Sequence, residues 1–192
     1  MRLGHEKALE KIGEQSLIER TLSCLSPVSQ RVLVVTSQAQ FGLIAARVKG
    51  KIIVDVCPGK GVLGGLYTGL ASSDTFYNLV VGCDMPFLNR DLLRYLIGLA
   101  PDFDVVIPKI AGMAEPLHAV YSKKCLASIE QLLQESRLAI SELFSLVRTR
   151  YVDEAEITKF DSKHLSFFNI NTQDDLRKAK MLMRQGANSS NW

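Results

Sequence analysis

The chain has few cysteines and histidines, and they form no pattern typical of a metal site. Its 192 residues include three histidines and four cysteines. The cysteines, at positions 24, 57, 83 and 125, lie far apart and form no CxxC pair, so a structural zinc site is not indicated. Buried, reduced thiols at Cys24, Cys57, Cys83 and Cys125 are the better interpretation.

Long apolar runs are also absent. No stretch approaches the roughly 18 to 20 apolar residues that a membrane-spanning helix needs. The segment Met1-Arg2-Leu3-Gly4-His5-Glu6-Lys7 is followed by no apolar region, so it does not have the form of a signal peptide. Together with the reduced cysteines, these absences favour a cytoplasmic protein with no membrane partner.

Charge of one sign does not accumulate anywhere in the sequence. The chain has 23 Lys and Arg residues against 20 Asp and Glu residues, a net charge of +3 without a basic run. A nucleic-acid partner is therefore not indicated, whereas an enzyme acting on small anionic molecules fits the balance. At 47% hydrophobic residues the chain can bury a core. We expect one domain over residues 1–185 and a flexible tail over residues 186–192.

Apolar periodicity predicts an alternation of strands and helices. Strands are expected at residues 31–36, 51–54, 77–82, 104–108, 117–121 and 147–152. Helices are expected at residues 17–25, 38–49, 63–72, 89–99, 123–134, 140–146 and 173–184. This order predicts an α/β fold, with a mainly parallel sheet and helices on both faces.

An acidic residue directly follows one of the buried strands, in Gly82-Cys83-Asp84-Met85-Pro86-Phe87-Leu88. Ligands of open α/β sheets bind beyond the carboxyl ends of the strands, which is where Asp84 would project its carboxylate. Such a ligand suits Mg²⁺, which proteins hold with one or two carboxylates plus substrate phosphates. The alternative is that Asp84 only caps the turn into the next helix.

A glycine-rich turn follows an earlier strand, in Asp55-Val56-Cys57-Pro58-Gly59-Lys60-Gly61-Val62-Leu63-Gly64-Gly65. Without side chains, its glycines would let a base or ribose approach the backbone closely. The segment does not match the GxxxxGK[ST] phosphate loop. The alternative is that these glycines serve only tight turning and close helix packing.

Two basic residues flank a glycine at the start of the chain. Arg2 and Lys7, on either side of Gly4, could hold phosphates. A charged and solvated terminus would give the same string of residues, so the two interpretations stay open.

Five segments in this order resemble the molybdenum cofactor guanylyltransferase family, of the molybdopterin-guanine dinucleotide biosynthesis protein A type. They are RLGHEKAL, PGKGVLGGLYTGL, CDMPFL, EPLHAVYSK and FFNINTQDDL. The resemblance spans nearly the whole chain and implies a nucleotide-binding fold of the glycosyltransferase A type. It also implies Mg²⁺-dependent transfer of GMP from GTP to molybdopterin, with release of pyrophosphate.

The resemblance also assigns residues on the nucleotide side. Lys7 corresponds to a lysine that contacts the nucleotide phosphates, in a loop that includes Arg2 and Gly4. Asp55 corresponds to an acidic GTP-binding residue, beside a turn that contains Gly59 and Gly64. Asp84 corresponds to the magnesium aspartate of the CDMP motif, and Asp84 and Lys7 are the expected catalytic residues.

On the acceptor side, the resemblance indicates Asn169, Asn171 and His118 as residues that bind molybdopterin. Alternate residues of an extended segment point the same way, which groups Asn169 with Asn171. A structural role for a partly buried His118 is the alternative. Thr172 and Asp175 have the spacing of a capping box that opens the last helix.

The chain departs from the family at its beginning, where members carry a first strand and a Leu-Ala-Gly-Gly loop that it lacks. Loss of an interior strand would cost several kcal/mol of ladder bonding and burial. We therefore expect Met1 to be internal to a longer natural sequence.

The alternatives to GMP transfer are a nucleotidyltransferase for CTP or another phosphorylated acceptor, or a non-catalytic protein that binds molybdopterin or a molybdoenzyme. Apo-molybdoenzymes or cofactor chaperones are further expected partners.

Overall fold

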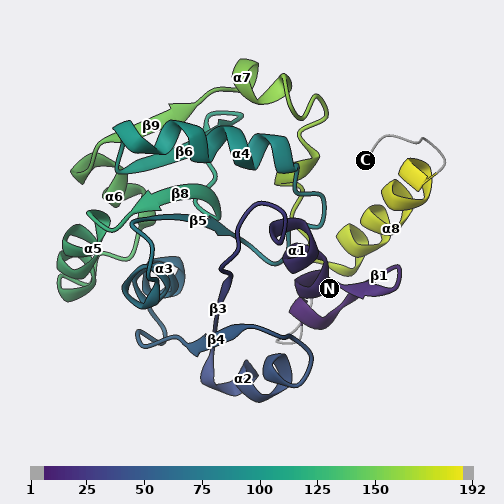
Figure 1. Cartoon of the computed structure of the whole chain (residues 1–192), viewed down its shortest axis with the longest axis horizontal. Helices are drawn as coiled ribbons and strands as arrows, with labels where there is room; N and C mark the ends of the chain where they lie inside the picture. Colours follow the sequence, from purple (N-terminus) through teal and green to yellow (C-terminus); the bar gives the residue numbers. More distant parts are fainter. Residues whose placement is uncertain (1–6, 188–192) are drawn as a thin grey trace.

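The computed structural model of the protein describes residues 7–187 (Figure 1). Its α-helices are α1 (Leu17–Leu25), α2 (Gln38–Ala45), α3 (Gly61–Ser72), α4 (Arg90–Leu99), α5 (Cys125–Gln134), α6 (Ile140–Leu146), α7 (Glu154–Thr158) and α8 (Gln173–Ala187). Its strands are β1 (Lys11–Ile12), β2 (Gln15–Ser16), β3 (Leu33–Thr36), β4 (Lys51–Val54), β5 (Tyr77–Val81), β6 (Val105–Ile110), β7 (Met113–Ala114), β8 (His118–Ser122) and β9 (Thr149–Val152). Short 3-10 helices lie at Lys7–Leu9, Ala100–Asp102 and Leu165–Phe167.

The expected α/β class is confirmed, but the main sheet is mixed. Its strands follow the order β5-β8-β6-β7, with β9 on the other side of β6. β6 and β9 are parallel, whereas β8 runs antiparallel to both β5 and β6. The reversal has a plain cause, because only a short hairpin segment separates β6 from β8, and parallel strands need a crossover of a dozen or more residues.

Helices cover both faces of this sheet, which makes three layers (Figure 1). Alternate residues of each strand point to opposite faces. Val105 and Ile107 of β6 pack in the same cluster as residues of α3, α5 and α6, whereas Val106 packs with residues of α4 and α7. The strands β6 and β8 are therefore buried on both sides, as their continuous apolar sequence predicts.

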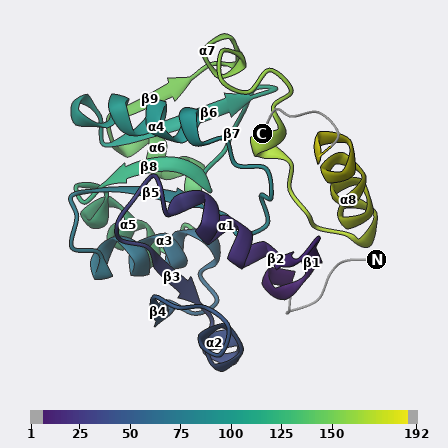
Figure 2. The ribbon, with the colours of Figure 1, turned by 45° about the vertical axis from the view of Figure 1, so that its right-hand side comes forward.

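The strands β3 and β4 form a separate parallel pair. Within residues 7–187, β3 pairs only with β4 and β5 pairs only with β8, so no ladder joins the pair to the main sheet. Helices bridge the two sheets instead. Gly69 of α3 lies against Val35 of β3, and a cluster around Ile18 of α1 contains both Val34 of β3 and Cys83, which follows β5. Figure 2 shows α1 crossing between the two sheets.

Helix and strand boundaries agree with the expected ones within a few residues, with one larger difference. The helix expected at residues 38–49 ends at Ala45. The chain turns there, and Val48 packs with Ile18 and Ile44 instead of continuing the helix. The last helix reaches Ala187, three residues past its expected end. The hairpin of β1 and β2 was not predicted, because each of its strands is only two residues long.

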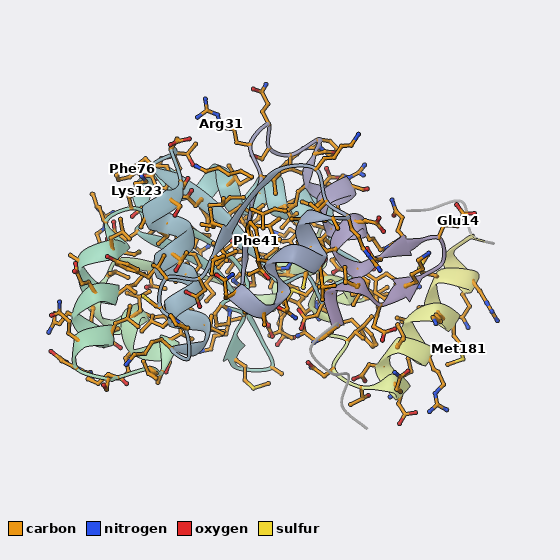
Figure 3. All side chains as sticks on the ribbon, turned by 90° about the horizontal axis from the view of Figure 1, so that it is seen from below. Glu14, Arg31, Phe41, Phe76, Lys123 and Met181 are labelled. Carbon is orange, nitrogen blue, oxygen red and sulfur yellow. The ribbon has the colours of Figure 1, made fainter. Side chains whose placement is uncertain are left out.

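The direction of β5 determines which end of the molecule carries Asp84. β5 begins after Phe76, whose side chain Figure 3 shows beside Lys123 at the opposite end from Met181 of α8. The backbone N–H of Lys123 donates to the Phe76 carbonyl at 2.8 Å and fixes this amino end of β5. The carboxyl end of β5, with Asp84 beyond it, therefore faces the region of α1 and α8.

Two expectations from composition concern the cysteines and membrane spans. All four cysteines are free thiols, but only Cys125 is fully buried; Cys24, Cys57 and Cys83 are partly exposed, so the expectation of four buried thiols was wrong for these three. None of the helices within residues 7–187 combines the length and the apolar character that crossing a bilayer requires.

His118 is a buried polar residue at the start of β8. Its side chain is 0% exposed, and neither ring nitrogen has a hydrogen-bond partner among the described residues. The ring packs against Phe167, with 4.8 Å between ring centroids. Burial lowers the pKa of His118 from 6.5 to about 4, although the charge of Asp161 acts in the opposite direction. The folded protein therefore holds His118 as a neutral imidazole.

We expect this histidine to make the protein sensitive to acid. Above pH 6.5 His118 is neutral in both states, whereas between pH 6.5 and 4 only the unfolded chain takes up the proton. The free energy of unfolding should therefore fall by about 3 kcal/mol over that range because of this group. Urea unfolding at a series of pH values measures the slope, and His118→Leu should make it shallower. Carboxylates titrate alike in both proteins, so equal slopes would contradict the assignment.

Candidate active site

The site is built around the loop that follows β5. The backbone N–H of Gly82 donates to the Leu117 carbonyl at 2.9 Å, which ties the strand end to β8. Two residues later, the carbonyl of Asp84 accepts a hydrogen bond from the Ile170 N–H at 3.0 Å. The backbone on both sides of the Asp84 side chain is therefore fixed, and its carboxylate has a defined direction.

Three of the predicted residues meet at this carboxylate. The Lys7 Nζ lies 2.6 Å from Asp84 Oδ2 and 2.7 Å from Asn171 Oδ1. The side chains of Lys7 and Asp84 are 22% and 23% exposed, so the ion pair is partly shielded from water. We call this group of three residues the Lys7 cluster. It joins the start of the chain, the end of β5 and the segment before α8.

The alternative role for Asp84, as a helix cap, does not hold. Asn89 is the N-cap of α4, and its side-chain oxygen accepts hydrogen bonds from the backbone N–H groups of Asp91 and Leu92. The carboxylate of Asp84 points to Lys7 instead. It is therefore available to chemistry at the sheet edge.

The segment before α8 presents its two asparagines differently. Ile170 is fully buried and separates them, as an extended backbone requires. Asn171 joins the Lys7 cluster, whereas the Asn169 side chain, within residues 7–187, makes a long hydrogen bond from Nδ2 to the Phe167 carbonyl at 3.5 Å. The structure thus unites Asn171, but not Asn169, with Lys7 and Asp84.

The expected capping box at the start of α8 is present. The Asp175 N–H donates to Thr172 Oγ1 at 3.1 Å, and the Thr172 N–H donates to Asp175 Oδ2 at 2.8 Å. The hydrogen bond from the Thr172 hydroxyl is the main cause that lowers the pKa of Asp175. Asp175 Oδ2 also accepts from the backbone N–H of Asn171, at 3.1 Å. The cap therefore fixes the backbone of Asn171 and leaves its side chain to Lys7.

Asp55 shapes the glycine-rich turn from within. Its Oδ1 accepts hydrogen bonds from the Cys57 N–H at 2.9 Å and from the Thr68 hydroxyl at 2.8 Å. The other oxygen, Oδ2, has no partner within residues 7–187. One carboxylate oxygen thus organises the turn while the second is free to meet a ligand.

The two glycines named in this turn have structural reasons to be glycine. Gly59 lies at a φ of +79°. A Cβ at Gly64 would lie 2.7 Å from the Cys57 carbonyl, so α3 approaches the turn more closely than any side chain allows. Close packing therefore accounts for Gly64, and no hydrogen bond or ion pair joins this turn to the Lys7 cluster among the described residues.

The remaining predicted residues lie elsewhere. His118 is completely buried rather than partly buried, and it contacts Phe167 instead of the Lys7 cluster. Its position directly opposite Val81 on the neighbouring strand places it beneath the site. Arg2 and Gly4 lie outside the described residues.

Two supporting residues were not found from the sequence. The Arg20 Nε donates to the Pro86 carbonyl at 2.6 Å, which holds the loop after Asp84. Asp161 accepts the backbone N–H groups of Leu165 and Ser166, at 3.1 and 2.7 Å, and so shapes the approach to Asn171. Both act on backbone groups distant along the chain, and no local sequence pattern signals such contacts.

The chemistry available at the site is electrostatic. Burial raises the pKa of the Cys83 thiol to about 11, so this neighbour of Asp84 stays protonated and is not a nucleophile. Within the described residues there is no group of three or more His, Cys, Asp or Glu side chains that could hold a metal alone. One carboxylate, with an amide oxygen nearby, suits a Mg²⁺ ion whose other ligands are waters and substrate phosphates. The arrangement thus fits the binding of a metal-complexed phosphate ester.

Gly82 should control the direction of the Asp84 carboxylate. A Cβ at Gly82 would lie 2.6 Å from Asp84 Oδ1, so Gly82→Ala must turn the carboxylate away from its place in the cluster. Because only the end of a side chain has to move, we expect the variant to fold. We expect it to bind Mn²⁺ roughly tenfold more weakly in the presence of GTP, as electron paramagnetic resonance would measure.

The control for this variant is Gly98→Ala in α4, where an added Cβ meets nothing within 4 Å. It should leave Mn²⁺ binding unchanged and should stabilise the helix slightly. Unchanged Mn²⁺ affinity in Gly82→Ala would show that this glycine does not position Asp84.

Comparison with known proteins places the fold and the family. A family model described as the MobA-like NTP transferase domain matches residues 1–151. A protein of Pelotomaculum thermopropionicum, named "Probable molybdenum cofactor guanylyltransferase", is 32% identical over 191 residues, which cover 100% of this chain and 92% of that protein.

Solved structures agree with this assignment. The molybdopterin-guanine dinucleotide biosynthesis protein A from Archaeoglobus fulgidus has a TM-score of 0.83 at 29% identity, over 95% of this chain and 92% of that one. The 2-C-methyl-D-erythritol 4-phosphate cytidylyltransferase from Thermus thermophilus shares the fold, with a TM-score of 0.69 at 16% identity over 96% and 100% of the chains. The expected nucleotidyltransferase fold is thus confirmed, and the chain belongs to the family of MobA-like NTP transferases.

Proposed function

We propose that this chain transfers GMP from GTP to molybdopterin and releases pyrophosphate, which forms the molybdopterin guanine dinucleotide cofactor. The observation that carries the proposal is the Lys7 cluster, which brings a cation, a carboxylate and an amide to one point at the carboxyl end of β5. The family membership and the name of the relative that covers the whole chain support the same activity.

The nucleotide side of the site consists of Lys7, Asp55, Asp84 and the turn around Gly59 and Gly64. Lys7 has a compact charge on a flexible side chain, which suits a triphosphate. The free oxygen of Asp55 can accept a hydrogen bond from the base or ribose, while the close approach at Gly64 keeps the turn in shape. Arg2 and Gly4 belong to the same phosphate-binding loop in this proposal.

A divalent metal ion is typical of nucleotidyltransferases, and we propose Mg²⁺ with Asp84 as its ligand in this chain. Asp84 offers a partly exposed carboxylate at the sheet edge, 2.6 Å from the Lys7 ammonium. The metal, when bound, would neutralise the triphosphate and stabilise the departing pyrophosphate. Such a site agrees with the preference of Mg²⁺ for few carboxylates and many phosphate or water oxygens.

The reaction needs little from the protein except position and charge. A terminal phosphate oxygen of molybdopterin forms a bond to the α-phosphorus of GTP, and the bond from that phosphorus to the β-phosphate oxygen breaks. The attacking phosphate is already ionised at neutral pH, so no residue has to remove a proton. Lys7 therefore compensates the charge of the reacting phosphates directly, whereas Asp84 would do so through the Mg²⁺ that it holds, and the two keep the phosphates in line.

We assign the acceptor side to Asn171 and Asn169, with His118 beneath it. Asn171 has a fixed backbone and a side chain at the reaction centre, which makes it the first residue to contact molybdopterin. His118 would act through packing, because its ring is buried against Phe167. A cytoplasmic location, and delivery of the product to apo-molybdoenzymes or cofactor chaperones, belong to the same proposal.

Asp84→Asn tests the metal role. The amide keeps the size of the side chain but removes the charge, so we expect the rate of pyrophosphate release from GTP and molybdopterin to fall about a hundredfold or more. Asp91→Asn is the matched control, because Asp91 is an exposed residue of α4 whose carboxylate pairs with Arg94 on the helix surface. Equal rates in Asp84→Asn and the unaltered protein would refute the proposal for Asp84, provided that thermal unfolding shows both to be folded.

A nucleotide panel tests the substrate. With Mg²⁺ and molybdopterin, GTP should release pyrophosphate faster than CTP, ATP or UTP. A strong preference for CTP would assign the chain to cytidylyl transfer instead. GTP binding without turnover on any acceptor would support a non-catalytic binding protein.

A further inference from the structure

One ammonium group contacts both halves of the proposed site. The Lys7 Nζ lies 2.6 Å from Asp84 Oδ2, on the side assigned to the metal and nucleotide. The same nitrogen lies 2.7 Å from Asn171 Oδ1, on the side assigned to the acceptor. One cation therefore engages both oxygens.

A metal ion cannot share this arrangement with Lys7. A Mg²⁺ ion sits about 2.1 Å from a carboxylate oxygen, which would bring the dication within a few ångströms of the Lys7 ammonium. Like charges at such a distance repel strongly in a partly buried site. The other carboxylate oxygen, Oδ1, lies where a Cβ at position 82 would be, so Gly82 leaves the room that the carboxylate occupies.

The backbone of Lys7 is anchored, whereas its side chain can move. Lys7 begins a short 3-10 helix, and the next two residues, Ala8 and Leu9, pack on a core cluster with Ile18. A change of position for the ammonium group therefore requires only rotation of the long side chain. The phosphates of an incoming nucleotide supply the negative charge that can receive it.

We propose that Lys7 is an exchangeable cation whose displacement couples the two halves of the site. The metal and nucleotide displace Lys7 from Asp84, and the same movement frees Asn171 Oδ1 for the acceptor. This inference rests on the proposed function, since it uses the roles given there to Asp84 and Asn171.

The coupling follows from the geometry of Asn171. Its backbone N–H is held by Asp175 at 3.1 Å, so the residue itself stays in place when Lys7 leaves. Within residues 7–187, its side-chain oxygen has Lys7 as its hydrogen-bond donor. Removal of one ammonium group thus exposes two oxygens at once, one on each side of the reaction centre.

Binding of Mn²⁺ in the absence of nucleotide tests the exchange. Lys7→Met removes the competing charge and keeps the length of the side chain. We expect it to bind Mn²⁺ about tenfold more tightly than the unaltered chain, the size of effect that a neighbouring charge has on a partly buried carboxylate. Electron paramagnetic resonance of free Mn²⁺ measures the affinity. Lys11→Met, at an exposed lysine of β1, is the control and should leave the affinity unchanged.

Lys7→Met should have the opposite effect on nucleotide affinity, because it also removes the cation that pairs with the phosphates. GTP should then bind the variant more weakly than the unaltered chain, as calorimetry with Mg²⁺ would measure. Failure of Lys7→Met to bind Mn²⁺ more tightly without nucleotide would overturn the exchange.

Failure of this inference is distinguishable from failure of the proposed function. If GTP turnover requires a metal and Asp84, but Lys7→Met does not tighten Mn²⁺ binding, only the exchange is wrong. If the unaltered chain shows no turnover with any nucleotide, the proposed function fails, whatever the Mn²⁺ affinity of Lys7→Met is. In Asp84→Asn, removal of Lys7 should no longer affect Mn²⁺, because the shared carboxylate is gone.

Discussion

The ion pair between Lys7 and Asp84 is the contact on which the arrangement of the site depends. The two residues are 77 positions apart, and Asn171 lies 164 positions from Lys7. No helix or strand joins these three segments directly. Each is held by its own part of the fold, and the cluster forms only when all three are in place. The site is thus a consequence of the tertiary structure rather than of any one motif.

The site combines a fixed backbone around the carboxylate with a charged side chain that can move. Hydrogen bonds from Gly82 to Leu117, and from Ile170 to Asp84, hold the backbone around the carboxylate. The lysine side chain, by contrast, is long and flexible, and it can change partners at little cost. Catalysis by position needs the first property, whereas entry of a charged substrate needs the second.

Local features of the site were predictable from sequence, because they obey short-range rules. Asp84 follows a buried strand, and ligands gather at such strand ends. The cap at Thr172 accepts a hydrogen bond from a backbone N–H in the first turn of α8, and its spacing from Asp175 is recognisable.

Long-range features were not predictable in the same way. Arg20 and Asp161 bind backbone groups of distant segments, and any residue can supply a carbonyl or an N–H. The antiparallel direction of β8, by contrast, could have been predicted, because the strands expected at residues 104–108 and 117–121 leave a connection too short for a parallel crossover. The burial of His118 depended on Phe167 packing over it from another part of the chain.

The division of the strands into two sheets has a consequence for how the molecule opens. Within residues 7–187, no ladder of hydrogen bonds connects β3 and β4 to β5, and packing of α1 and α3 holds the two sheets together instead. The smaller sheet can therefore separate without breaking the main one. Its amide hydrogens should then exchange with solvent through a partial opening, while those of β6 and β8 await global unfolding. The glycine turn that follows β4 belongs to this less protected unit, so the nucleotide side of the protein would be the part that a bound ligand stabilises most.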